Sequence, residues 1–202
     1  MGYTTDFLGH IDIDPGLNEA EVAYLDAFHR SRRFDRTGGP YEVPGNPYVD
    51  ERPEPNRAAY NRPAPGQPQL WCQWQPCWGG CCLAFDGIEK FYEPVRWLRY
   101  LVDHFLRPGA EASRSGQAHF DEFTFDHHLE GLVVGCRRDN KQLFGIRVQR
   151  NVVSTELLRP ADPRYSDYPP LPYEDAIDRE RKSSQRRKSS GRGRRLGVVE
   201  GG

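Results

Sequence analysis

The order in which strand-like and helix-like patterns follow one another constrains the fold of this chain most strongly. Apolar and polar residues alternate in short stretches, as in half-buried strands, and apolar residues recur every three to four positions in two longer stretches, as in amphipathic helices. The expected order is strand, helix, two strands, helix and then three or four strands. We expect strands at about 5–13, 69–75, 81–86, 119–126, 131–137, 142–149 and 152–157, and helices at about 18–33 and 91–106.

This order predicts an α+β fold with a single antiparallel sheet and both helices packed on one of its faces, in a ferredoxin-like arrangement. Local signals support the two helices. Asn18 is a favourable N-cap residue, and Glu21, three positions later, completes a capping box. Pro94 is tolerated in the first turn of the second helix, and Pro108 with Gly109 ends it.

Two segments lack such patterns. Residues 34–68 are rich in Pro, Gly, Asn and Arg, and so long a connection within a compact domain is unusual, so we expect an irregular excursion over the surface. Beyond residue 158 the chain turns to Pro and Tyr, and then to Arg, Ser and Gly, a composition typical of disorder. We therefore predict a single α+β domain at 1–158 and a disordered basic tail at 159–202.

Charge is distributed unevenly along the chain. The whole chain has 28 basic and 29 acidic residues, a formal net charge of −1. Residues 179–202 hold nine of the basic and two of the acidic residues, about +7, which leaves 19 against 27, about −8, in residues 1–178. An acidic body argues against a folded nucleic-acid interface, which needs a basic face. Only the tail, from Arg179 to Arg195, is expected to contact nucleic acid, weakly and without sequence specificity.

Composition also bears on location. The sequence contains no run of about 18 apolar residues, so we expect no contact with a membrane. The first residues, 1–7, lack the basic flank and apolar stretch of a signal peptide, which favours a soluble, cytoplasmic protein. Five cysteines, four of them within eleven residues, do not form a secreted disulfide framework. No cofactor is expected.

The cysteine cluster has the spacing Cys-x4-Cys-x3-Cys-Cys, from Cys72 to Cys82, and matches no common zinc pattern. Adjacent residues of a strand point to opposite faces, so Cys81 and Cys82 are not expected to bind one metal ion. We therefore expect small buried side chains and a loop thiol rather than a metal site. Cys77 and Cys81 remain candidates for metal ligation with a histidine, or for a reversible disulfide in a redox-responsive module.

Other chemical motifs are few. Residues 126–130 read Asp-His-His-Leu-Glu, a titratable cluster that could bind metal or move protons, but we expect these side chains to be solvated in a turn between strands. His104, near the end of the second helix, is expected to interact with the terminal carbonyl groups of that helix. The sequence has no Gly-rich phosphate loop, no Gly-x-Ser-x-Gly elbow and no His-Glu-x-x-His motif. These absences favour a function without catalysis.

Strand alternation assigns side chains of the 69–75 and 81–86 strands to opposite faces of the sheet. The face under the helices is expected to carry Cys72, Trp74, Cys82 and Ala84, and the open face Trp71, Gln73, Leu83 and Phe85. Aromatic residues on an open sheet face can bind a protein or stack nucleic-acid bases. Because the body is acidic, base stacking is the less favoured reading, and the 34–68 segment could instead cover this face. The leading hypothesis is a non-enzymatic binding protein that recognises another protein through this face.

A set of short motifs lies in the first half of the chain, at residues 2–7, 31–33, 67–74, 86–92 and 97–101. The first reads Gly-Tyr-Thr-Thr-Asp-Phe. Together the motifs resemble those of a family of small uncharacterised proteins of bacteria and their bacteriophages. The resemblance covers residues 2–108 well and the later strands loosely, and it implies a cytosolic protein of a bacterium or phage without naming an activity. The cysteine-rich turn and the tail depart from the family pattern.

If that family shares a binding site, the resemblance implies polar candidates within these motifs: Asp6, Arg32, Arg33, Gln73, Glu89, Lys90 and Tyr92. Structural roles are the alternative, because arginines suit the end of the first helix and Glu89 beside Lys90 can pair at the surface. The rival functional hypothesis is an enzyme that acts on a nucleotide or other small charged ligand. It requires Arg32, Arg33, Glu89, Lys90 and Tyr92 to line one concave pocket.

Overall fold

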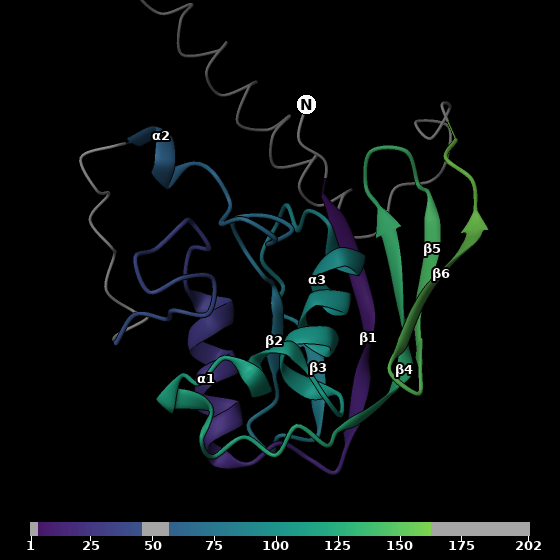
Figure 1. Cartoon of the computed structure of the whole chain (residues 1–202). Helices are drawn as coiled ribbons and strands as arrows, with labels where there is room; N and C mark the ends of the chain where they lie inside the picture. Colours follow the sequence, from purple (N-terminus) through teal and green to yellow (C-terminus); the bar gives the residue numbers. More distant parts are fainter. Residues whose placement is uncertain (1–3, 46–56, 163–202) are drawn as a thin grey trace, which may run out of the picture. The chain divides into compact units, whose positions relative to one another are not determined.

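A six-stranded antiparallel sheet lies at the centre of the computed structural model, which describes residues 4–45 and 57–162 (Figure 1). Its strand order is β2-β3-β1-β4-β5-β6. The long first strand is central, since it pairs with β3 on one side and with β4 along its whole length on the other. The strands are β1 (Thr5–Asp14), β2 (Trp74–Pro76), β3 (Cys82–Phe85), β4 (His128–Arg137), β5 (Leu143–Gln149) and β6 (Val152–Arg159).

Two main helices accompany the sheet. Helix α1 (Glu19–Arg30) begins with the predicted capping box, in which the Asn18 side chain accepts a hydrogen bond from the Glu21 amide and the Glu21 carboxylate accepts one from the Asn18 amide. Helix α3 (Pro94–Leu101) continues as a π-helical turn over Val102–Leu106. Three shorter helical segments are α2 (Arg57–Tyr60) and the 3-10 turns Glu111–Arg114 and Ala118–Phe120.

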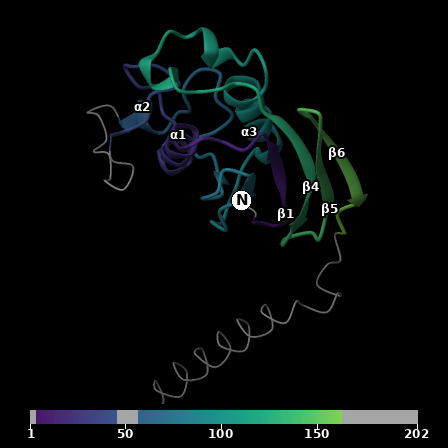
Figure 2. The same cartoon turned by 90° about the horizontal axis from the view of Figure 1, so that it is seen from below.

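Both main helices pack on the same face of the sheet, as Figure 2 shows. Alternate residues of the central strands, such as Ile11 and Val133, point into the core between the layers and are fully buried. Phe28 of α1 and Trp97 of α3 fill the same core from the helix side. The α+β class, the single antiparallel sheet and its two helices are therefore as predicted.

The sheet is not a standard ferredoxin-like one. The sequence of strands and helices along the chain agrees with the prediction, but the order of the six strands is not that of a standard ferredoxin-like fold, because β5 and β6 extend the sheet beyond β4. The strand expected at 119–126 is also wrong. This segment holds a 3-10 turn and irregular chain, because Phe120 and Phe123 both turn inward against Tyr24.

The predicted faces of β3 are reversed. Trp74 pairs with Phe85 across the β2–β3 hairpin, and paired residues share a face, so Phe85 points into the core. Leu83 lies opposite Ile11 and is fully buried. Cys82, expected under the helices, points to the other face together with Ala84. The error arose from the hairpin register, which alternation within each strand does not determine.

The described parts of the 34–68 segment lie on the helix side of the sheet. Phe34 forms an isolated bridge with Pro63, and the buried ring of Tyr41 packs on Phe105 and Phe120. This part of the segment does not cover the open sheet face. Residues 46–56 and the predicted tail beyond residue 162 lie outside the described residues. In the ranges that the structure describes, the helices are too short or too polar to cross a bilayer.

Candidate functional site

A pocket of about 640 Å³ lies beside the end of α1 and between the chain segments that flank the β2–β3 hairpin. We call it the α1 pocket. Its lining comprises His29, Arg30, Arg32, Gln69, Leu70, Trp71, Gln73, Asp86, Ile88, Glu89, Lys90 and Tyr92. Three short segments that are distant in sequence therefore meet at one concavity, which is the usual form of a small-ligand site.

Six of the nine binding candidates named from the sequence line this pocket: Arg32, Trp71, Gln73, Glu89, Lys90 and Tyr92. The other three lie elsewhere. Asp6 accepts hydrogen bonds from Arg138, which also contacts Glu89 at 3.2 Å between Nη1 and Oε1. Phe85 packs in the core, with its ring centroid 5.0 Å from that of Phe7. The convergence required by the small-ligand hypothesis is thus present for all its residues except Arg33.

Arg33 is fully buried and holds chain segments together. Its guanidinium lies 4.0 Å from the centroid of the Phe28 ring. It donates to the backbone carbonyls of Pro40 and Glu42 at 2.7 and 2.9 Å and to the Ser31 hydroxyl at 2.8 Å. Burial, the largest influence, lowers the pKa of Arg33 to about 10, so the side chain is cationic at neutral pH. Its role is structural.

Arg32 presents a cation at the edge of the α1 pocket. Its guanidinium stacks over the Tyr60 ring at 4.5 Å and lies 5.7 Å from the Trp71 centroid. Hydrogen bonds to the Tyr60 carbonyl and the Asn61 side chain orient it. Among the described residues no carboxylate pairs with Arg32, and the same is true of the exposed Lys90. Two cations of the pocket are therefore available to an anionic ligand.

His29 and Asp86 are the most deeply buried titratable residues of the pocket lining, and neither was predicted from the sequence to be a site residue. His29 Nδ1 lies 3.8 Å from Asp86 Oδ2, and His29 Nε2 lies 3.5 Å from Asp26 Oδ1. Neither ring nitrogen makes a hydrogen bond of normal geometry. Burial lowers the pKa of His29 to about 4, so its ring is neutral at pH 7, and burial raises the pKa of Asp86.

A second buried pair, Glu21 and His127, lies away from the pocket. His127 Nε2 is 3.0 Å from Glu21 Oε1, and His127 Nδ1 is 2.7 Å from the Pro15 carbonyl oxygen. The Glu21 carboxylate also accepts hydrogen bonds from the amide and hydroxyl of Thr124. The expectation that this histidine is solvated is wrong, because its ring is fully buried. Every polar atom of the pair has a partner, so the pair stabilises the fold.

His104 also differs from its expected role. Its ring stacks on Tyr100 with 3.8 Å between centroids, and its Nδ1 lies 2.6 Å from the Tyr41 hydroxyl. Glu111 approaches the same nitrogen at 3.3 Å. These contacts join α3 to the 34–45 segment. They replace the expected interaction with the terminal carbonyls of the helix.

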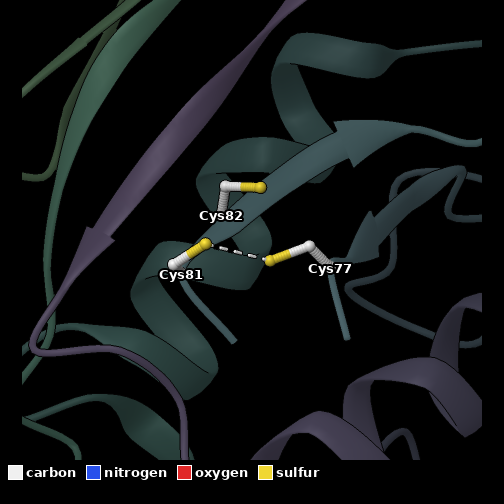
Figure 3. A group of neighbouring side chains, drawn as sticks. All are labelled: Cys77, Cys81 and Cys82. Atoms are coloured by element: carbon white, nitrogen blue, oxygen red, sulfur yellow. Dashed lines mark hydrogen bonds between the residues drawn. The ribbon is translucent and has the colours of Figure 1, made fainter. Parts of the chain in front are cut away.

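Three cysteines gather at the turn of the β2–β3 hairpin (Figure 3). The sulfur atoms of Cys77, Cys81 and Cys82 all lie within 4.8 Å of one another, and Cys77 and Cys81 Sγ are 3.3 Å apart. The expectation that Cys81 and Cys82 both lie on a strand is wrong, because β3 begins at Cys82 and Cys81 belongs to the turn. Cys72 is buried in the core, as predicted.

The surroundings of the three thiols give them different pKa values. Burial opposes ionisation of Cys77, but hydrogen bonds from the other two cysteines, including their backbone amides, lower the pKa of its thiol to about 7. Burial and the neighbouring Cys77 raise the pKa of Cys82 to about 12. The hydrogen bond and charge of Cys77 raise the pKa of Cys81. A thiolate at Cys77 is thus favoured over one at either neighbour.

Comparison with protein-family models, with curated proteins and with solved structures found no match to this chain. The resemblance to a family of bacterial and phage proteins therefore stays a prediction.

Proposed function

We propose that this protein binds a small anionic ligand with a planar ring system, of the nucleotide class, in the α1 pocket. The observation that carries the proposal is the convergence of Arg32, Lys90 and Trp71 in the lining of one pocket. The proposal keeps the ligand class of the enzyme hypothesis formed on the sequence, but not its catalytic activity. It does not require a catalytic step.

The two cations would bind the phosphate or carboxylate groups of the ligand. An arginine guanidinium can donate two parallel hydrogen bonds to such a group, and a lysine ammonium adds a second charge. Arg32 is held in place by Tyr60 and Asn61, so little side-chain entropy is lost when it binds. Glu89 does not neutralise Lys90, because its carboxylate contacts Arg138.

Aromatic and polar lining residues would bind the ring system. Trp71 is 44% exposed and offers a face for stacking, an interaction worth about 1–3 kcal/mol per base in proteins that bind single strands. Tyr92 adds a second aromatic side chain to the same lining. The ring nitrogens of His29 are covered by the protein and lie toward Asp26 and Asp86, so we assign them no contact with the ligand.

Isothermal titration calorimetry of the full chain with nucleoside mono-, di- and triphosphates tests the proposal. We expect at least one of them to bind, and Arg32→Gln and Trp71→Ala each to weaken its affinity at least tenfold, which is about 1.4 kcal/mol. Arg96→Gln is the matched control, since Arg96 is exposed and lies outside the pocket lining. The proposal fails if no nucleotide binds, or if Arg32→Gln and Trp71→Ala bind as tightly as the control.

The open sheet face supports a second candidate function, the binding of another protein. Trp71 and Phe85 do not lie on this face, but Leu8, Leu132 and Leu158 do, and they are 80%, 41% and 47% exposed. Leu132 and Leu158 meet over Gly145, since a Cβ atom there would lie 3.3 and 3.9 Å from their Cδ1 atoms. Contiguous exposed apolar side chains of this kind often mark interaction sites.

Affinity capture with the full chain distinguishes this candidate. We expect a specific protein to be retained, and the double substitution Leu8→Gln with Leu132→Gln to abolish its retention. Trp78→Gln is the control, because Trp78 is 91% exposed but lies at the hairpin turn, away from the leucines. Equal retention by the double variant and the wild type would remove the support for this function.

A further inference from the structure

We infer that the turn between β2 and β3 is a binding site for a zinc ion, held by the side chains of Cys77, Cys81 and Cys82. This inference is independent of the ligand proposed for the α1 pocket, because the two linings have no residue in common. Figure 3 shows the Cys77 and Cys81 sulfur atoms facing each other across the turn, with Cys82 beside them.

The distances suit a tetrahedral thiolate site. Zinc binds cysteine sulfur at about 2.3 Å, which places the sulfur atoms of a regular tetrahedron about 3.8 Å apart. Cys77 and Cys81 Sγ are 3.3 Å apart, and each pair among the three sulfur atoms is within 4.8 Å. Shifts of about 1 Å or less, within the range of small side-chain rotations, would bring all three to the required spacing.

The backbone of the turn is held in place by the protein itself. The Cys77 amide donates to the Cys82 carbonyl at 3.0 Å, and the Gly80 amide donates to the Cys77 carbonyl at 2.9 Å. Two further bonds tie the turn to the end of β1 and the start of α1, from the Ile13 amide to the Cys81 carbonyl and from the Leu17 amide to the Gly80 carbonyl, both 2.9 Å. The three ligands are thus positioned before any ion binds.

The ligand set selects the class of metal. Thiolates prefer soft or borderline ions over magnesium and calcium, which take oxygen ligands. Among the described residues, this is the one group of three or more close metal-ligating side chains, and it contains no fourth member. Cys81 is exposed, so the fourth tetrahedral position opens to solvent, where water or an exogenous ligand completes the coordination.

Metal analysis of the reduced, full-length chain tests the inference. After incubation with Zn²⁺ and removal of unbound metal, we expect one zinc per chain and release of thiol protons on binding. Substitution of the exposed Cys81 by serine is expected to weaken zinc binding at least a hundredfold, and Cys77→Ser to do the same. Cys136→Ser is the matched control, because Cys136 lies on β4 outside the group, and it should retain one zinc.

Two further readouts make the test decisive. Co²⁺ in place of Zn²⁺ should give a thiolate-to-cobalt charge-transfer band in the wild type and in Cys136→Ser, but not in Cys81→Ser. Far-ultraviolet circular dichroism should show that the serine variants are folded. The inference is overturned if the reduced chain holds no zinc, or if Cys81→Ser binds zinc as the wild type does. It is also overturned if Cys77 and Cys81 form a disulfide that persists in the presence of both reductant and zinc.

Discussion

The contact between Glu21 and His127 joins the first turn of α1 to the segment that leads into β4. Both side chains are buried, and removal of one partner of such a pair leaves the other as an uncompensated buried charge. We expect His127→Gln, in which the amide cannot carry the positive charge, to lower the free energy of unfolding by about 3–5 kcal/mol. Urea denaturation of the wild type and the variant at pH 5.5 measures this difference.

The same pair predicts a dependence on pH. Burial lowers the pKa of His127, but its hydrogen bonds with Glu21 and the Pro15 carbonyl outweigh this effect, and the net shift is upward. Burial raises the pKa of Glu21, but its bonds with His127, Asn18 and Thr124 produce a net downward shift. The histidine contribution is therefore full below about pH 6.5 and is lost as the pH rises through its folded pKa. The glutamate contribution is full above about pH 4.3 and is lost as the pH falls through its folded pKa.

Wild type and His127→Gln should therefore differ most between about pH 4.3 and 6.5. Above that window their unfolding free energies should converge as the histidine loses its proton in the folded state. A difference that stays constant from pH 5 to pH 9 would show that the pair acts by packing and not by charge.

Residues with local partners were the easiest to predict. The capping box of Asn18 and Glu21 lies within four positions, and it is present in the structure. The partner of Glu21, His127, is 106 positions away, and no local pattern distinguishes it from a solvated histidine. His29 and Asp86 escaped prediction for the same reason, since their environment exists only after distant segments have packed.

Among the elements, the connection after α1 depends on Arg33. Its guanidinium donates to the carbonyls of Pro40 and Glu42. When the side chain is shortened, the Pro40 carbonyl keeps a donor in the Gln67 side chain, but the Glu42 carbonyl loses its partner. We expect Arg33→Leu to lower the free energy of unfolding by about 1–3 kcal/mol, the cost of one unsatisfied polar group. In this variant, the rate of backbone amide hydrogen exchange should increase most in the segment around residues 40–42. Arg96→Leu, at an exposed position, should change stability by less than about 0.5 kcal/mol.

The hairpin turn offers a matched pair of glycines. Gly80 has a φ of +68°, and a Cβ atom there would lie 2.4 Å from the Leu17 carbonyl oxygen. Gly80→Ala should therefore cost at least about 1–3 kcal/mol, because alanine disfavours this φ and the backbone must also move. Gly79→Ala meets no atom within 4 Å and should leave thermal stability nearly unchanged or slightly higher. Equal melting temperatures for the two variants would contradict the geometry of the turn.

The hairpin also shows which features of an element cannot be predicted from its own sequence. The strand at 81–86 was predicted to within one residue at each end, but the strand expected at 69–75 is only the short β2, Trp74–Pro76. Which face each side chain occupies depends on how the strands pair. The pairing of Trp74 with Phe85 places aromatic residues of both strands in the core. The segment at 119–126 fails for a related reason, since Phe120 and Phe123 bury their rings from a 3-10 turn that has no strand partner.

At the scale of the whole molecule, the fold class could be predicted from the order of the patterned stretches. The spacing of apolar residues distinguishes half-buried strands from amphipathic helices, and so it gives the order of the two along the chain. The α1 pocket was foreseen only as a set of motifs whose residues would have to converge. Four of the five residues that the small-ligand hypothesis required do so, although neither their spacing in sequence nor the chemistry of any one of them specifies a pocket. The cysteine turn was predicted wrongly, since a strand was expected to begin at Cys81 and in fact begins at Cys82.

The uneven distribution of charge along the whole chain predicts how it binds RNA. Removal of residues 179–202, with nine basic and two acidic residues, changes the net charge from −1 to about −8. We expect the full chain to bind a single-stranded RNA oligonucleotide weakly at low salt, and the shortened chain not to bind it, as fluorescence anisotropy can measure. The slope of log affinity against log salt should not exceed about 6 in magnitude, which is about 0.7 for each of nine cations. Equal RNA binding by the shortened chain would instead place a nucleic-acid site within the acidic body, where the open sheet face would have to supply it without a basic surface.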